Sequence, residues 1–181
     1  MQQMLVMTVI GHDRPGLVDS VARLVVEHSG NWLESRMSRL GGQFAGILRV
    51  EIPTDRESAL VAALKKLDAR GLTVVVSTDQ PQPTAAGGKL RSLEIVGYDR
   101  PGIVRQIAQA LASHNVNVED LETELSSAAM TGEILFKASA KLSIPDSCDV
   151  GALRQELEEI AADLIVEISL REVTDTRASA R

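Results

Sequence analysis

The sequence predicts an α+β protein built from two tandem copies of one βαββαβ unit, each an antiparallel sheet with both helices on one face. Three observations predict this fold class. A nine-residue stretch recurs 86 residues later, the hydrophobic period changes between strand and helix spacing in the same order in both copies, and a Pro- and Gly-rich stretch separates them.

The repeat determines how the chain divides. Residues 10–18 (IGHDRPGLV) reappear as 96–104 (VGYDRPGIV). The same spacing pairs further identical residues: Ala22 with Ala108, His28 with His114, Asn31 with Asn117, and Gly46 with Gly132. We therefore expect four segments: a first domain over 1–78, a linker over 79–90, a second domain over 91–173, and a flexible tail over 174–181.

Each copy opens with a short apolar run that is typical of a buried strand, over 4–10 and over 93–97. A helical period follows each DRPG segment and predicts a helix of three to four turns. The residues expected on its buried face are Leu17, Val21, Leu24 and His28 in the first copy, and Ile103, Ile107, Leu111 and His114 in the second. A second strand is expected to begin near Asn31 and Asn117.

The third strand shows the clearest alternation, which predicts one buried face and one wetter face. Its expected inward residues are Leu48, Val50 and Ile52, matched by Ile134, Phe136, Ala138 and Ala140. The second helix carries Leu60, Val61, Leu64 and Leu67, matched by Leu153, Leu157 and Ile160. Final strands are expected over 73–77 and 164–170, and the resulting order is that of a split-βαβ, ferredoxin-like sandwich.

The composition argues against direct binding of nucleic acid. The net charge is −6, so the chain lacks the basic surface that attracts phosphate backbones. Aromatic residues make up 2% of the chain, which leaves few rings for stacking on bases. The sequence shows no secretory-signal pattern and no apolar run of about 20 residues, so we expect a cytoplasmic protein without membrane contact.

No catalytic pattern stands out. The three histidines and Cys148 lack metal-ligand spacing, and the glycines form neither a dinucleotide-binding nor a phosphate-binding motif. His28 and His114 are interpreted as helix-end residues, and Cys148 as an incidental loop thiol. We therefore expect no enzymatic activity, no metal and no cofactor.

The turn between the first strand and the first helix is the strongest candidate for a binding site. Asp13 and Asp99 fit the N-cap of that helix, and Pro15 and Pro101 fit its first turn. A helix N-terminus presents N–H groups and a positive dipole end, and together these suit a carboxylate.

Two further residue types recur at this turn and behind it. Gly16 and Gly102 lack a Cβ and let a ligand approach the backbone closely. The side chains of Asn31 and Asn117 each carry hydrogen-bond donors and an acceptor, so each can bind both the ammonium and the carboxylate of an amino acid. A well-capped helix without a ligand explains the glycine and aspartate positions equally well, so both interpretations stay open.

Asp-Arg-Pro-Gly-Leu-Val, followed after a helix by Gly-Asn inside a βαββαβ unit, resembles the ACT domain, a regulatory module that binds amino acids. A chain of two such domains resembles the glycine cleavage system transcriptional repressor family, to which residues 31–44 are similar. The resemblance implies a glycine-responsive protein that controls a separate DNA-binding activator by contact. It also implies ligand sites at an interface between domains or subunits, and the uncovered sheet faces favour a homodimer.

The ligand-binding residues that the resemblance implies are Asp13, Arg14, Gly16, Leu17 and Asn31 in the first copy, and Asp99, Arg100, Gly102, Ile103 and Asn117 in the second. Some serine-binding ACT domains carry Asn where this chain has Asp13 and Asp99. A carboxylate there favours an ammonium and disfavours a second acid group, so a small neutral amino acid fits best. In the second copy the Gly-Asn pair becomes Val116-Asn117.

Two other functions remain open from the sequence. The chain fits a ligand-free ACT module that serves interaction or oligomerisation, and it fits a regulatory subunit of an enzyme of amino-acid metabolism.

Overall fold

The structure is a computed structural model and describes residues 1–79, 88–127 and 132–173. It divides into two compact units, Met1–Gln82 and Pro83–Arg181. Most of the expected linker (80–87) and the whole expected tail (174–181) lie outside the described residues. Among the described residues, no helix combines the length and the apolar content needed to cross a membrane.

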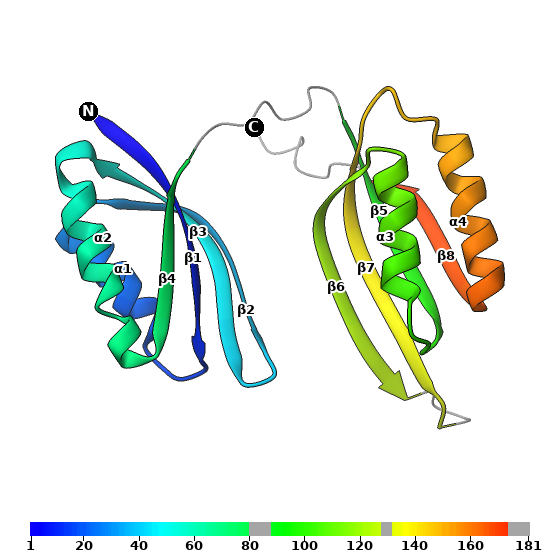
Figure 1. Cartoon of the computed structure of the whole chain (residues 1–181), viewed down its shortest axis with the longest axis horizontal. Helices are drawn as coiled ribbons and strands as arrows, with labels where there is room; N and C mark the ends of the chain where they lie inside the picture. The colour runs from blue at the N-terminus through cyan, green and yellow to red at the C-terminus, as the bar shows by residue number, and fades with distance from the viewer. Residues whose placement is uncertain (80–87, 128–131, 174–181) are drawn as a thin grey trace, which may run out of the picture. The chain divides into compact units, whose positions relative to one another are not determined.

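Both units follow the predicted βαββαβ order (Figure 1). The first unit contains β1 (Gln2–His12), α1 (Leu17–Glu27), β2 (Asn31–Leu40), β3 (Gln43–Pro53), α2 (Glu57–Lys65) and β4 (Leu72–Thr78). The second contains β5 (Lys89–Tyr98), α3 (Ile103–Ser113), β6 (Asn117–Ser127), β7 (Ile134–Ile144), α4 (Val150–Leu164) and β8 (Val166–Glu172). The strand orders are β2-β3-β1-β4 and β6-β7-β5-β8, and all strand pairs are antiparallel.

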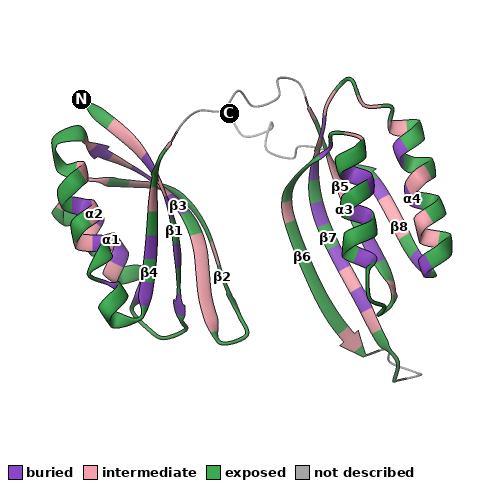
Figure 2. Ribbon diagram, viewed as in Figure 1, coloured by how far each residue is buried: buried purple, intermediate pink, exposed green. Residues whose placement is uncertain are grey.

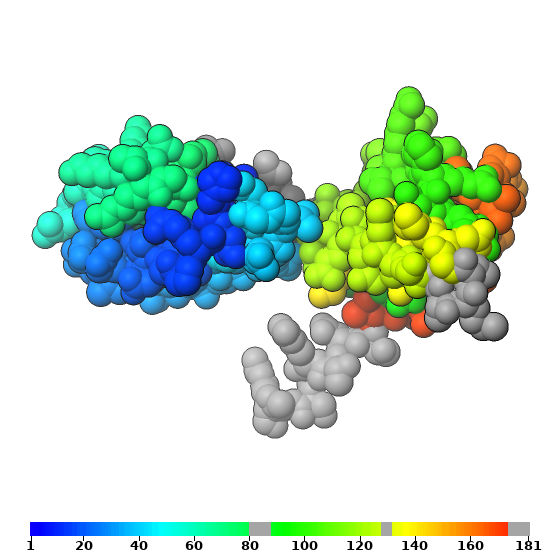
Figure 3. All heavy atoms as spheres, turned by 90° about the horizontal axis from the view of Figure 1, so that it is seen from below, coloured from blue at the N-terminus to red at the C-terminus, as the bar shows by residue number. Residues whose placement is uncertain are grey.

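In each unit the two helices cover one face of the sheet and the core lies between these layers (Figures 1 and 2). Strand alternation explains the division: Leu5, Met7 and Val9 face the helices, and the residues between them face away. The space-filling view shows one outer face of each unit, with the heavy atoms coloured along the chain (Figure 3). The two cores are separate clusters, so each unit has the hydrophobic interior of an independent domain.

The helix stripes differ slightly from those predicted. In α1 the fully buried residues are Leu17, Val21 and Val25, whereas Leu24 is only half-buried. Leu24 and Val25 lie three and four residues after Val21, so helical spacing allows either to face the core, and in the structure Val25 is the buried one. On β7, Ile134 is 56% exposed rather than buried, because the strand begins there beyond the cover of the helices.

The sequence repeat predicts that Gly46 and Gly132 occupy equivalent positions, and this prediction is wrong. Met7 pairs with Leu48, and its counterpart Leu93 pairs with Ala140, so equivalent positions on the third strands lie 92 rather than 86 residues apart. The second hairpin is therefore six residues longer than the first. The first hairpin turns tightly through Gly41 and Gly42, whose φ values of 57° and 78° suit a two-residue turn.

Candidate functional site

The turn that joins β1 to α1, and its counterpart between β5 and α3, is built around a glycine. Gly16 has φ 89° and ψ 5°, and Gly102 has φ 100° and ψ −6°, a left-handed conformation that disfavours side chains. These glycines are the N-caps, and the helices begin one residue later. A Cβ on Gly16 would meet no atom within 4 Å, so the space above the helix start is open.

The predicted N-cap role of the two aspartates is wrong. Neither helix start has a side-chain cap, because the glycine turn places three residues between each aspartate and the first helical residue. Pro15 and Pro101 likewise lie in the turn before the helix. The N–H of Asp13 instead donates to the carbonyl of Gly42 at 2.9 Å, which ties the turn to the β2–β3 hairpin.

The two turns differ in charge. The Asp13 carboxylate lies 2.6 Å from Nε of Arg39 on β2, whereas no ion pair forms at Asp99 among the described residues. Asp19 lies in the first turn of α1, and Arg105 occupies the equivalent position of α3. A cation at a helix start adds to the attraction for an anion, and an anion opposes it. The start of α3 is therefore better suited to a ligand carboxylate because of Arg105, and Asp99 is more available to a ligand ammonium than the paired Asp13.

The other sequence-predicted turn residues have defined surroundings. Arg14 donates from Nη2 to the carbonyl of Arg70 at 2.8 Å and so braces the turn against the start of β4. Leu17 and Ile103 are 4% and 2% exposed, so only their backbone groups can meet a ligand. Arg100 is exposed beside the second turn.

Tyr98, the residue before Asp99, lies beside the second turn, although no sequence pattern indicates it as a site residue. Its hydroxyl forms a hydrogen bond with Glu133, which raises the pKa of Tyr98 above the ordinary value. The phenol beside the second turn therefore loses its proton less readily than an ordinary tyrosine. The signal for this contact is absent from the sequence, because Glu133 reaches Tyr98 only through the pairing of β5 with β7.

Within one domain the asparagine lies far from the turn. Asn31 begins β2 opposite Glu51, and Glu51 pairs with Met4 near the start of β1. Asp13 follows the other end of β1, so about eight residues, roughly 26 Å, separate the two along the sheet. Asn117 has the same placement in the second domain, where its Nδ2 donates to Glu119 at 2.8 Å. No single domain can bring its own turn and asparagine to one small ligand.

The histidines have the helix-end positions that the sequence predicts. His28 follows α1 and its Nδ1 lies 2.8 Å from the carbonyl oxygen of Leu24. His114 follows α3 and its Nε2 lies 2.9 Å from the Glu156 carboxylate. Across residues 1–79, 88–127 and 132–173, no three His, Cys, Asp or Glu side chains gather in a way that could hold a metal ion.

The helix-free sheet faces of the two domains differ strongly. At the centre of this face the first domain carries six apolar or small residues, here called the apolar face: Val6, Thr8, Ile10, Ala45, Ile47 and Val75. Arg36 and Arg49 lie on the same side of the sheet, opposite Ile47 and Val6. The strand registers place at the equivalent positions of the second domain Ser92, Glu94, Val96, Lys137, Ser139 and Ser169. On the apolar face Ile10, Ile47 and Val75 are 48%, 55% and 59% exposed.

Charges at the border of the apolar face are paired within the domain. Arg49 lies 2.9 Å from both Glu34 and Asp79, and these contacts raise the pKa of its guanidinium. The two carboxylates more than balance the guanidinium, so covering Arg49 at this border would cost less than covering an isolated arginine.

Comparison with known proteins agrees with the two-domain architecture. The chain is 24% identical over 178 residues to the glycine cleavage system transcriptional repressor of Escherichia coli (strain K12), covering 95% of this chain and 91% of that protein. A crystal structure of a protein of unknown function from Galdieria sulphuraria superposes with a TM-score of 0.82 at 28% identity, over 96% of this chain and all of the other.

A second crystal structure, provisionally assigned as a glycine cleavage system transcriptional repressor, has a TM-score of 0.70 at 20% identity and covers 97% of this chain and 99% of its own. It shares the same fold. The sequence model of the ACT domain matches residues 3–77 and 93–171, which are the two βαββαβ units described above. This chain therefore belongs to the ACT domain family, with two ACT domains in tandem.

Proposed function

We propose that this chain is an amino-acid-responsive regulatory protein that binds a small neutral amino acid, such as glycine, and controls a DNA-binding activator by contact. The observation that carries the proposal is a left-handed glycine at the start of α1 and α3 with space above it: a Cβ on Gly16 would meet no atom within 4 Å, and one on Gly102 would meet the side-chain nitrogen of Gln106 at 3.9 Å. The similarity to a bacterial glycine cleavage system transcriptional repressor supports glycine as the first ligand to test.

In this proposal the ligand carboxylate accepts hydrogen bonds from first-turn N–H groups, which have no carbonyl partner one turn earlier. The ligand ammonium faces the carboxylate of Asp13 or Asp99. An asparagine from a second domain completes the site, because the asparagine of the same domain lies at the far end of its sheet.

The edge strand β6 supports such pairing of domains. Val118, Leu121 and Leu125 follow Asn117 along β6 and are 40%, 49% and 60% exposed. They share the sheet side of the buried β7 residues, yet no helix covers them (Figure 2). A second domain that packed on this apolar edge would come close to Asn117 and would remove exposed apolar area from water.

A non-enzymatic role agrees with the related repressor and with the surface of the domains. Aromatic residues make up only 2% of the chain, which leaves few rings for stacking on bases, and the net charge of −6 disfavours direct contact with DNA. Control of transcription would therefore act through a protein partner in the cytoplasm.

Ligand selectivity tests this proposal in solution. We expect glycine, alanine or serine to raise the midpoint of thermal unfolding of the full chain, because a ligand that binds only the native state adds about 2.7 kcal/mol at a hundredfold excess over its Kd. Aspartate should give no shift, because its second carboxylate would face Asp13 or Asp99. Equal shifts with aspartate and glycine would contradict the proposed site.

The apolar face favours a second function, oligomerisation, which needs no ligand. We infer that two chains pair through the apolar faces of their first domains, stacked as two sheets at about 10 Å. The second domain cannot substitute, because its equivalent positions are mostly polar or charged.

The variant Ile47→Glu tests this dimer. Two glutamates would meet near the centre of the interface, so we expect dimer dissociation to become at least about tenfold more favourable in light scattering. The matched control is Ser139→Glu at the equivalent position of the second domain, which should leave the dimer intact. A monomeric wild-type chain, or equal effects of both variants, would argue against this interface.

A further inference from the structure

A cation occupies the core-facing side of β5 in the second domain. Leu93 and Ile95 face the helices, and the alternation of the strand places Arg91 on that same side. The register shows that Leu5 is the equivalent residue of the first domain, and Leu5 is 0% exposed. The fold itself therefore accepts leucine here, and the guanidinium requires another explanation.

The hydrogen bonds of Arg91 are incomplete. The side chain is only 13% exposed, and its Nη2 donates to Glu172 at 2.8 Å. Its Nε–H is buried and has no acceptor among the described residues. A buried donor without an acceptor costs free energy, so this atom indicates a place for an absent acceptor.

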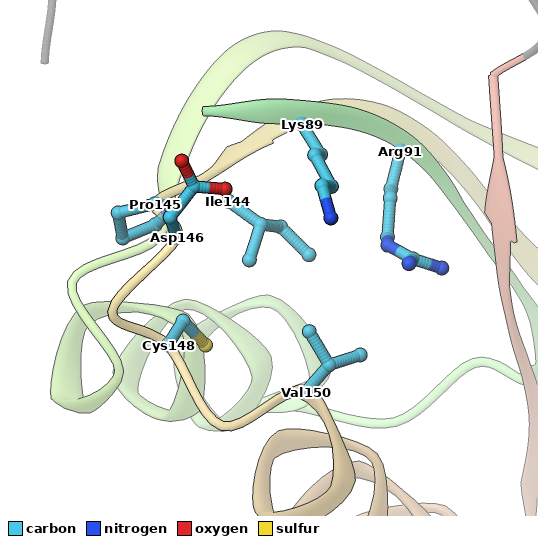
Figure 4. A pocket seen from close by; sticks show the side chains of 7 residues that line it. All are labelled: Lys89, Arg91, Ile144, Pro145, Asp146, Cys148 and Val150. Atoms are coloured by element: carbon cyan, nitrogen blue, oxygen red, sulfur yellow. The ribbon is translucent and has the colours of Figure 1, made fainter. Parts of the chain in front are cut away.

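A cavity of about 90 Å³ lies beside this guanidinium. Figure 4 shows the ammonium of Lys89 and the guanidinium of Arg91 reaching from β5 into one space, with Cys148 and Val150 on the facing wall. Its other lining residues are Ile144, Pro145 and Asp146. The volume holds several waters or one small organic ion.

The charges in this cavity favour a small anion. No ion pair forms at Lys89 within the described part of the chain, and Arg91 shares its charge only with the exposed Glu172. Burial raises the pKa of the Cys148 thiol, with a smaller contribution from the neighbouring Asp149 carboxylate, so the thiol that faces the cations carries no charge. Among the residues that the structure describes, Asp146 is the one carboxylate that lines the cavity.

We propose that this cavity is a second, separate binding site that takes a small carboxylate with a short apolar body. One carboxylate oxygen accepts from the Arg91 Nε–H, the Lys89 ammonium balances the charge, and Ile144 and Val150 enclose the apolar end. All residues of the site belong to the second domain, so it forms without the turn site and without domain pairing.

The first domain provides the matched variants. Gln3 and Leu5 stand where the second domain has Lys89 and Arg91, so Arg91→Leu and Lys89→Gln introduce residues that the same fold already carries. Acetate, glycine and inorganic phosphate are the probes, and ¹H–¹⁵N NMR of the full chain measures their binding. The signals of the Arg91 Nε–H and the Cys148 amide report binding in this cavity, and the signal of the Gly102 amide reports binding at the turn. The two proposed sites are therefore tested independently.

Acetate should shift the Arg91 Nε–H and the Cys148 amide saturably, and Arg91→Leu should weaken the Cys148 response at least about tenfold. The variant Asp146→Asn distinguishes two classes of ligand. If the wild type binds glycine more tightly than acetate and Asp146→Asn removes this preference, the ligand is an amino acid. If the wild type binds glycine and acetate equally, the ligand is a simple carboxylic acid. Tighter binding of phosphate than of acetate, an unchanged response in Arg91→Leu, or no saturable shift with either carboxylate would overturn the proposal.

Discussion

Replacing Leu5 by arginine is expected to unfold the first domain under conditions in which the second stays folded. Leu5 is fully buried, and its neighbours across the sheet are Val50 and Thr78. Arg91 has Glu172 in the place of Thr78, so only the second domain supplies a carboxylate to a guanidinium at this position. An uncompensated buried charge costs about 3–5 kcal/mol, which is a large share of the stability of a small domain.

Urea unfolding followed by far-UV circular dichroism measures this effect as a separate early transition. The reciprocal variant Arg91→Leu is the control, and it should keep or raise the stability of the second domain, because a leucine replaces a partly satisfied buried cation. A Leu5→Arg variant with the unfolding midpoints of the wild type would contradict the expected cost of burying an unpaired charge at this position.

Replacing Gly102 by valine is expected to abolish amino-acid binding at the second turn. At φ 100° a β-branched residue is strained by about 1–3 kcal/mol, and its side chain would project into the open space where the ligand is proposed to lie. We expect at least a hundredfold loss of affinity, on the order of 2.7 kcal/mol.

Equilibrium dialysis with radiolabelled glycine measures this loss, and far-UV circular dichroism checks that the variant is folded. Gly16→Val tests the first turn in the same way. Its effect should be smaller, because the Asp13 carboxylate is already paired with Arg39 and is less available to the ligand ammonium, and because the acidic Asp19 opposes the ligand carboxylate. Wild-type affinity in both valine variants would remove the turns from the binding site.

The sequence predicts the fold because its signals are local and occur twice. The recurring DRPG segment, the helical stripe behind it and the alternation of Leu48, Val50 and Ile52 each predict one element. Hairpin length is not encoded in this way. Gly132 stands 86 residues after Gly46 by coincidence, and only the pairing of β7 with β5 shows that six residues extend the second hairpin.

The candidate site is less predictable, because its contacts are non-local. An aspartate followed by Pro and Gly resembles a capped helix start, but the left-handed glycine moves that start past the reach of the carboxylate. The pairing of Asp13 with Arg39 depends on how the β2–β3 hairpin folds against the turn. The sequence does not indicate Arg91 as a strand residue, because the apolar run that predicts the strand covers 93–97 whereas β5 begins at Lys89.

Calorimetric titration of the full chain with glycine, repeated on Asn31→Ala and Asn117→Ala, tests the central claim most directly. The account predicts saturable heat in the wild type and an affinity about tenfold weaker in at least one asparagine variant, because each lost side chain removes hydrogen bonds to the ligand. No heat of binding in the wild type, or undiminished binding in both variants, would contradict an amino-acid site that joins the turn of one domain to the asparagine of another.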